Sequence, residues 1–192
     1  MRILVVDESD ERAALLGEAL TTAGHEVVAS LSSPLELLRA VDALGPDVIV
    51  IDTESPTRDV LEHVVIVSQS SPRPIVMFAS DAGGAAIRDA VRAGVSAYVV
   101  DGHDIGRVNS IVAVACARFD EFQRLRAELA EANLKLSERK RVERAKGLLM
   151  QTRGVSEDEA YHALRKLAMS KKLRLGDVAQ QVIDTAELLG KG

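Results

Sequence analysis

Three carboxylates in the first part of the sequence fall where short apolar runs end. Asp7 and Glu8 follow the run Ile3–Val6, and Asp52 follows the run Val48–Ile51. Functional groups of a parallel sheet gather at the carboxyl ends of its strands, so we expect these side chains to lie together. Clustered carboxylates bind Mg²⁺ through their oxygen atoms, and the metal lets one of them attack a phosphoryl group. The pattern indicates an acidic cluster that could hold Mg²⁺, with no other cofactor required.

A second group of reactive side chains is cationic and lies near the end of the chain. From Lys135 to Gly192 there are thirteen Lys or Arg and eight Asp or Glu residues, a net charge of +5, whereas residues 1–134 carry −10. Such asymmetry in a protein of net charge −5 favours a nucleic-acid partner for the terminal part. The alternative is that these cations only solvate a helical bundle.

The acidic residues must be positioned by alternating apolar and amphipathic segments within residues 1–103. We expect strands at Ile3–Val6, Glu26–Leu31, Val48–Ile51, Ile75–Phe78 and Ala97–Val100. We expect helices at Ser9–Ala23, Pro34–Leu44, Arg58–Ser68 and Gly83–Ala93. Five mostly continuous apolar strands that alternate with helices predict an α/β fold with a doubly wound five-stranded parallel sheet.

This N-terminal part resembles the receiver domain of two-component response regulators. The resemblance assigns Asp52 to the phospho-acceptor position and Asp7 and Glu8 to the acidic metal pair. Pro56 fits the loop that follows the acceptor in this family, and Tyr98 fits its aromatic switch position. The resemblance therefore implies Mg²⁺ chemistry at this end of the sheet.

Two parts that such a domain requires are missing. Ala79 stands where a Ser or Thr normally holds the phosphoryl group, Ser80 comes one residue late, and Asp101 replaces the expected lysine. Four carboxylates would then converge without a fixed positive charge, and such a group must bind a cation or hold a proton. We therefore expect a pseudo-receiver domain that serves as a binding and dimerisation platform without phosphorylation of Asp52.

Helical periodicity must position the cationic residues of the terminal part. Three apolar stripes at helical spacing predict a small three-helix bundle, because helices this short must bury their stripes against one another. Gly154 ends the first helix, and Ser156 with Glu159 predicts a capping box at the start of the second. The stripes are Val142, Ala145, Leu148 and Leu149; Ala160, Leu164, Leu167 and Ala168; and Leu175, Val178, Ala179, Val182, Ile183 and Ala186.

The terminal part resembles the ANTAR domain in a single register over some forty residues. The matching stretches are A-K-G-L-L-M at 145–150, S-E-D-E-A-Y at 156–161, L-R-K-L-A-M at 164–169 and L-x-x-V-A at 175–179. The resemblance implies that this domain binds paired stem-loops in leader RNA and prevents a terminator hairpin from forming.

The residues expected to contact RNA lie at or beside family-matching positions and outside the apolar stripes. They are Lys146, Gln151, Arg153, Arg165, Ser170 and Arg174. The four cations are expected to contact phosphates or stack on loop bases, and the two neutral side chains are expected to add hydrogen bonds. No catalytic set of residues is visible, so we do not expect an enzyme.

One long helix is expected to begin near Ile105 and to join the two parts. Apolar residues recur seven apart at Val108, Ala115, Phe122, Leu129 and Leu136. This spacing predicts a coiled coil and a parallel homodimer. The alternative is that the helix packs within its own chain, against the sheet and the bundle. The predicted domains are residues 1–103 (receiver-like), 104–138 (coiled coil) and 139–190 (ANTAR).

The whole pattern thus resembles an ANTAR-type response regulator. The stretch Tyr98 to Gly102, which lacks the usual lysine and proline, is most similar to the NasT-like antiterminators of nitrate assimilation. That subgroup implies control by a nitrate- or nitrite-sensing partner protein. The alternative is a DNA-binding response regulator controlled by phosphorylation of Asp52, although the terminal helices lack the pattern of a helix-turn-helix. Absence of a long apolar run, of a signal peptide and of paired cysteines favours a cytoplasmic protein without membrane contact.

Overall fold

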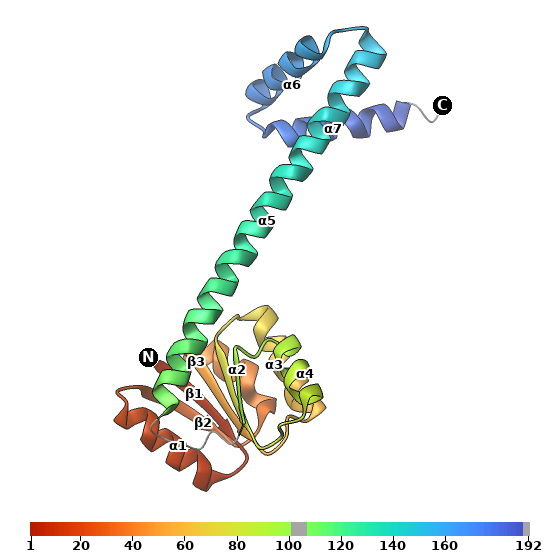
Figure 1. Cartoon of the computed structure of the whole chain (residues 1–192). Helices are drawn as coiled ribbons and strands as arrows, with labels where there is room; N and C mark the ends of the chain where they lie inside the picture. The colour runs from red at the N-terminus through yellow and green to blue at the C-terminus, as the bar shows by residue number, and fades with distance from the viewer. Residues whose placement is uncertain (101–106, 190–192) are drawn as a thin grey trace. The chain divides into compact units, whose positions relative to one another are not determined.

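The apolar runs of the N-terminal part form a five-stranded parallel sheet in the computed structural model of the protein (Figure 1). The strands are β1 (Arg2–Asp7), β2 (Glu26–Leu31), β3 (Val48–Thr53), β4 (Ile75–Ala79) and β5 (Ala97–Val100), in the order β2-β1-β3-β4-β5. The predicted α/β fold is confirmed. Because β1 and β3 are neighbours, their carboxyl ends meet at one edge of the sheet.

The structure describes residues 1–100 and 107–189, so that Asp101 lies outside the described residues. The chain divides into two compact units, Met1–Gln123 and Arg124–Gly192. The helix α5 (Val108–Arg153) contributes its first turns to the first unit and its remainder to the second.

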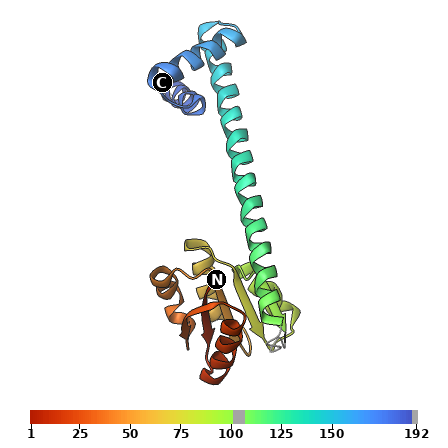
Figure 2. The ribbon, with the colours of Figure 1, turned by 90° about the vertical axis from the view of Figure 1, so that its left-hand side faces the viewer.

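Helices cover both faces of the sheet in the first unit (Figures 1 and 2). One face packs against α1 (Asp10–Thr22) and the first turns of α5, through the buried side chains of Leu16, Leu20, Val108, Val112 and Ala115. The other face packs against α2 (Leu37–Leu44), which follows the short helix η1 (Pro34–Glu36), and against α3 (Arg58–Ser70) and α4 (Gly84–Ala93). Both faces of the central strands are therefore buried, which explains why these strands are continuously apolar.

Helix ends in this unit follow from local sequence signals. Ser9 caps α1 and accepts a hydrogen bond from the backbone N–H of Arg12, and Thr57 caps α3 in the same way through Val60. Gly94 ends α4 with φ of 112°, and a Cβ at this position would lie 2.6 Å from the Cβ of Ser68. Only glycine satisfies both conditions at this helix end.

The second unit is a bundle of three helices. The remainder of α5 packs with α6 (Glu157–Lys171) and α7 (Leu175–Leu189) around the buried residues Ala145, Leu164, Ala168, Val178, Ala179 and Ile183. Gly154 follows α5 with φ of 66°, and the capping box of Ser156 and Glu159 is present at the start of α6. The predicted bundle thus forms from the predicted stripes.

The residues that recur seven apart along α5 have two different environments. Val108 and Ala115 are buried against the sheet, whereas Phe122, Leu129 and Leu136 are 61%, 63% and 52% exposed. The predicted intramolecular packing therefore applies to the first two residues of the series. The predicted coiled coil depends on the three exposed residues, Phe122, Leu129 and Leu136. Among the described residues, no helix combines the length and apolar character that a membrane span needs.

Candidate functional site

The predicted acidic cluster begins with two aspartates on neighbouring strands. Asp7 ends β1, Asp52 lies in β3, and the two are register partners. Asp7 is 1% exposed and Asp52 is 8% exposed. The parallel pairing of β1 and β3 therefore places two carboxylates side by side in a buried position, as the sequence predicted.

Arg12 supplies a positive charge at this position. Its Nη2 donates to Oδ1 of Asp7 at 2.9 Å, and its Nε donates to Oδ2 at 3.4 Å. The backbone N–H of Ser9 also donates to Oδ1, at 2.8 Å. The expectation that the carboxylates converge without a fixed positive charge is therefore wrong. The cap at Ser9 begins α1 immediately after β1, and this turn brings Arg12 back over Asp7.

The other predicted members of the acidic site are placed differently. Glu8 is exposed, and Asp101 lies outside the described residues. Among residues 1–100 and 107–189, no three His, Cys, Asp or Glu side chains form a group that could hold a metal ion. Both oxygens of Asp7 are hydrogen-bonded to Arg12, so a Mg²⁺ ion at Asp7 would compete with this guanidinium group, and the Mg²⁺ site stays a prediction.

Strands β4 and β5 carry the other positions that matter for phosphorylation in a receiver domain. Ala79 is buried at the end of β4, opposite Thr53 of β3, and Ser80 beyond it is exposed. The hydroxyl of Tyr98 donates to the backbone oxygen of Asp81 at 2.8 Å, and burial raises the pKa of this phenol. The aromatic side chain at the switch position is thus tied to the loop that follows β4.

Lys146, one of the predicted RNA contacts, has internal partners. Its Nζ lies 2.6 Å from Oε1 of Glu157 and 2.9 Å from Oε1 of Glu143, and its side chain is only 9% exposed. Hydrogen bonds to Glu157 and Glu143 raise the pKa of Lys146, and the bond from Lys146 lowers the pKa of Glu157. This ammonium group therefore joins α5 to the first turn of α6.

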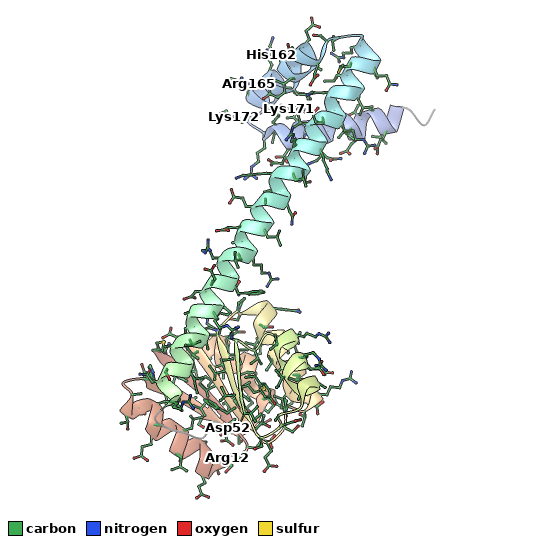
Figure 3. All side chains as sticks on the ribbon, in the orientation of Figure 1. Arg12, Asp52, His162, Arg165, Lys171 and Lys172 are labelled. Atoms are coloured by element: carbon green, nitrogen blue, oxygen red, sulfur yellow. The ribbon has the colours of Figure 1, made fainter. Side chains whose placement is uncertain are left out.

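Arg165 lies in a row of exposed side chains on α6, which we call the α6 row. The row consists of His162, Arg165, Met169 and, just past the helix end, Lys172. Figure 3 shows His162, Arg165 and Lys172 on the outer side of α6. The spacings of three, four and three residues keep these positions on one side of a helix. Within the described part of the chain, neither Arg165 nor Lys172 has an acidic partner within ion-pair distance.

The other predicted RNA contacts are exposed but do not all share this face. Ser170 lies five residues from Arg165, which turns it well away from the row on a helix, and its hydroxyl donates to the backbone oxygen of Leu167. Gln151 and Arg153 are exposed in the last turn of α5, and Arg174 is exposed before α7. Arg153 also lines a hollow of about 620 Å³ between the three helices, together with Lys171, Gln181 and apolar residues such as Leu148 and Leu167.

Several residues of both sites were not identified from the sequence. Arg12 stands in the first turn of α1 beside Asp10 and Glu11, where a cation opposes the helix dipole, and this placement was the available signal. His162 and Lys172 could have been found from their spacing to Arg165. Lys171 and Gln181, which form a hydrogen bond of 3.2 Å, come from different helices, and no sequence pattern connects them.

Comparison with protein families agrees with this arrangement of two units. Residues 3–112 match the response regulator receiver domain, and residues 130–183 match the ANTAR domain. The receiver match covers more than half of the chain. The chain belongs to the response regulator receiver family. This response regulator carries an ANTAR domain in its terminal unit.

Individual relatives add detail to this assignment. The transcriptional regulatory protein PdtaR of Mycobacterium tuberculosis is 28% identical over 184 residues, which cover 96% of this chain and 90% of PdtaR. The nitrate regulatory protein of Klebsiella oxytoca is 40% identical over 68 residues, which cover 35% of this chain and 17% of that protein. A match this short leaves the NasT-like subgroup a prediction.

Solved structures support the fold of the receiver domain. The receiver domain of a modulated diguanylate cyclase from Desulfovibrio desulfuricans has a TM-score of 0.55 and 19% identity, covering 62% of this chain and 95% of that one. At this identity the likeness concerns the fold alone.

Proposed function

We propose that this response regulator is an RNA-binding transcription antiterminator. In this proposal the ANTAR domain binds stem-loops in leader RNA and keeps a terminator hairpin from forming. The observation that carries the proposal is the ANTAR match at residues 130–183, in a bundle whose α6 presents an exposed row. This row includes Arg165 and Lys172, which have no acidic partner among the described residues. A regulator that acts in this way needs no catalytic residues and works in the cytoplasm, where leader RNA is transcribed.

The α6 row is the proposed centre of the RNA interface. Arg165 and Lys172 are free to bind phosphates, because no described carboxylate occupies them. The planar guanidinium group of Arg165 and the ring of His162 can also stack on unpaired loop bases. Met169 is 72% exposed and offers an adaptable apolar contact between the two cations.

The hollow between the three helices is a proposed second contact. Its apolar floor suits the face of an unstacked base, and Arg153 and Lys171 at its rim suit the adjoining phosphates. Gln151, Ser170 and Arg174 remain proposed contacts at the edges of this surface. Lys146 is excluded from the proposal, because its charge is already used by Glu143 and Glu157.

Control in this proposal comes from a partner protein that binds the receiver-like domain. Ala79 in place of a hydroxyl residue and the pairing of Arg12 with Asp7 both disfavour control by phosphorylation of Asp52. The 40% identity to part of a nitrate regulatory protein supports a nitrate- or nitrite-sensing partner.

A second copy of the chain is the proposed partner of α5. Leu125, Leu129, Ala132 and Leu136, which we call the α5 seam, are exposed at alternating spacings of four and three residues. That spacing is typical of a two-stranded coiled coil, in which each copy covers the seam of the other. The homodimer would present two ANTAR domains to paired stem-loops.

Sequencing of RNA crosslinked to the protein in cells tests the class of ligand. We expect enrichment of leader stem-loops, and recovery of genomic DNA or of no nucleic acid would overturn the proposal. A salt series with purified stem-loop RNA then tests the α6 row. Arg165→Ala should weaken binding and reduce the log–log salt slope by about 0.7 to 0.9, the change expected for one lost phosphate contact.

A matched control is available on the same helix. Lys166 is exposed and adjacent to Arg165 in the sequence, but it lies about 100° around the helix from Arg165, on the His162 edge of the α6 row. Lys166→Ala should therefore change affinity and slope less than Arg165→Ala does. Equal effects of the two substitutions would show that α6 attracts RNA only through its overall positive charge and not through a specific contact of Arg165.

A further inference from the structure

The acidic end of the receiver-like sheet contains a cation, Arg12, beside two buried carboxylates. Asp7 and Asp52 are buried register partners, and the side chain of Asp7 is fully buried. Two carboxylates in such a position repel each other unless a positive charge lies near them. A positive charge beside these two aspartates therefore stabilises this end of the sheet.

Arg12 meets this requirement through direct contacts. Its guanidinium group spans both oxygens of Asp7, in the two-point geometry that makes arginine–carboxylate pairs strong and directional. The guanidinium also lies within electrostatic reach of Asp52 and Glu54, since both charges, after that of Asp7, raise the pKa of Arg12. Figure 3 shows Arg12 and Asp52 at the same end of the sheet.

The position of Arg12 in its helix argues that this contact is specific. Arg12 is the third residue of α1, where the exposed N–H groups of the helix favour anions and disfavour cations. Asp10 and Glu11 beside it follow the usual preference. An arginine at this position is stabilised by Asp7 rather than by the helix that carries it.

The same contacts conflict with a bound divalent ion. Oδ1 of Asp7 already accepts from Ser9 and Arg12, and Oδ2 accepts from Arg12. A metal ion at Asp7 would have to displace the guanidinium group and would meet its positive charge at close range. The described residues offer no alternative group of three ligands.

We propose that Arg12 is a built-in replacement for the divalent cation at the acidic end of this receiver-like domain, and that removing its charge lets a divalent cation bind at Asp7. The chain itself thereby supplies the positive charge that a metal ion would bring to Asp7. This inference does not depend on RNA binding, because it concerns residues of the first unit alone.

Metal titration of the full chain tests the proposal. Mn²⁺ binding is followed by the electron paramagnetic resonance signal of the free ion, with Mg²⁺ as competitor. Arg12→Gln should bind Mn²⁺ at least about tenfold more tightly than the wild type, whereas Arg12→Lys, which keeps the charge, should resemble the wild type. Arg58→Gln is the matched control, because Arg58 also lies in a first helical turn but pairs with exposed Glu62 at 2.8 Å.

A double substitution locates the site. Asp7→Asn added to Arg12→Gln should abolish the gained affinity, and retention of that affinity would place the ion elsewhere and overturn the proposal. Wild-type binding as tight as that of Arg12→Gln would also overturn it. So would a folded Arg12→Gln protein, checked by circular dichroism, with no gain in affinity.

A measurement on the wild type alone keeps the proposal testable if the variants do not fold. Phenylglyoxal modifies accessible arginines, and mass spectrometry reports the modification of Arg12. Millimolar Mg²⁺ should leave the reactivity of Arg12 unchanged. An increase would show that Mg²⁺ displaces the guanidinium group from Asp7, which contradicts the proposed replacement.

Discussion

Leu129→Lys is the sharpest test of the proposed dimer, because Leu129 is the most exposed leucine of the α5 seam. Its side chain is 63% exposed and has neighbours at Leu125 and Leu136 that are 51% and 52% exposed. A dimer that covers the seam would bury this surface in both copies. Full burial of a leucine is worth about 1.5–3 kcal/mol.

The magnitude follows from the exposed fraction. Burying the remaining two thirds of Leu129 contributes roughly 1–2 kcal/mol per copy, and roughly 2–4 kcal/mol per dimer. Leu129→Lys should therefore weaken the dimer by roughly 30-fold to 1,000-fold in dissociation constant, and two facing ammonium groups add to this loss.

Sedimentation velocity over a concentration series measures this change. Leu35→Lys is the control, because Leu35 is 72% exposed in η1, outside α5, and the same substitution there should leave assembly unchanged. Circular dichroism verifies that both variants remain helical. Equal dissociation constants for the two variants, or a wild type that stays monomeric at every concentration, would refute the proposed dimer contact along the α5 seam.

Three further substitutions test other parts of the structure. Asp52→Asn should leave antitermination in a reporter assay nearly intact, and loss of activity in a folded variant would restore phosphorylation as the control. Lys146→Met should lower the melting temperature near neutral pH and remove one acid-dependent loss of stability. Lys146 lowers the pKa of Glu157 below its ordinary value of 4.5. The pair therefore stabilises the wild type above pH 4.5, and this contribution is lost as the pH falls through the lowered pKa. A variant with the wild-type pH profile of melting would contradict the role of this pair. Leu164→Ala should destabilise the terminal bundle by about 2–5 kcal/mol in denaturant unfolding, because Leu164 is 1% exposed in the core of the bundle. Lys166→Ala, at an exposed position, is the control. Equal losses of stability in the two variants would show that the bundle is not packed around Leu164.

Features that depend on neighbouring residues in the chain could be predicted from the sequence. The expected bounds of β2 and β5 coincide with the observed Glu26–Leu31 and Ala97–Val100. The capping box of Ser156 and Glu159 also formed as expected. Apolar periodicity and helix caps act over a few residues, so the pattern itself contains the physical cause.

The register of Asp7 and Asp52 was predictable at the level of the fold. Alternating strands and helices imply a parallel sheet, and such a sheet brings the carboxyl ends of neighbouring strands together. The ANTAR register was likewise visible as a family resemblance, and the family match at residues 130–183 agrees with it.

Only the tertiary structure decided which charges are paired and which are available. Lys146 and Arg165 both appeared in the sequence as candidates for RNA contact, but Lys146 meets Glu157 across the turn between α5 and α6. Arg12 reaches Asp7 because a strand, a cap and a helix turn the chain back within five residues. Periodicity indicates the face of an element on which a side chain lies, whereas the partner of a charge depends on which other element packs against that face.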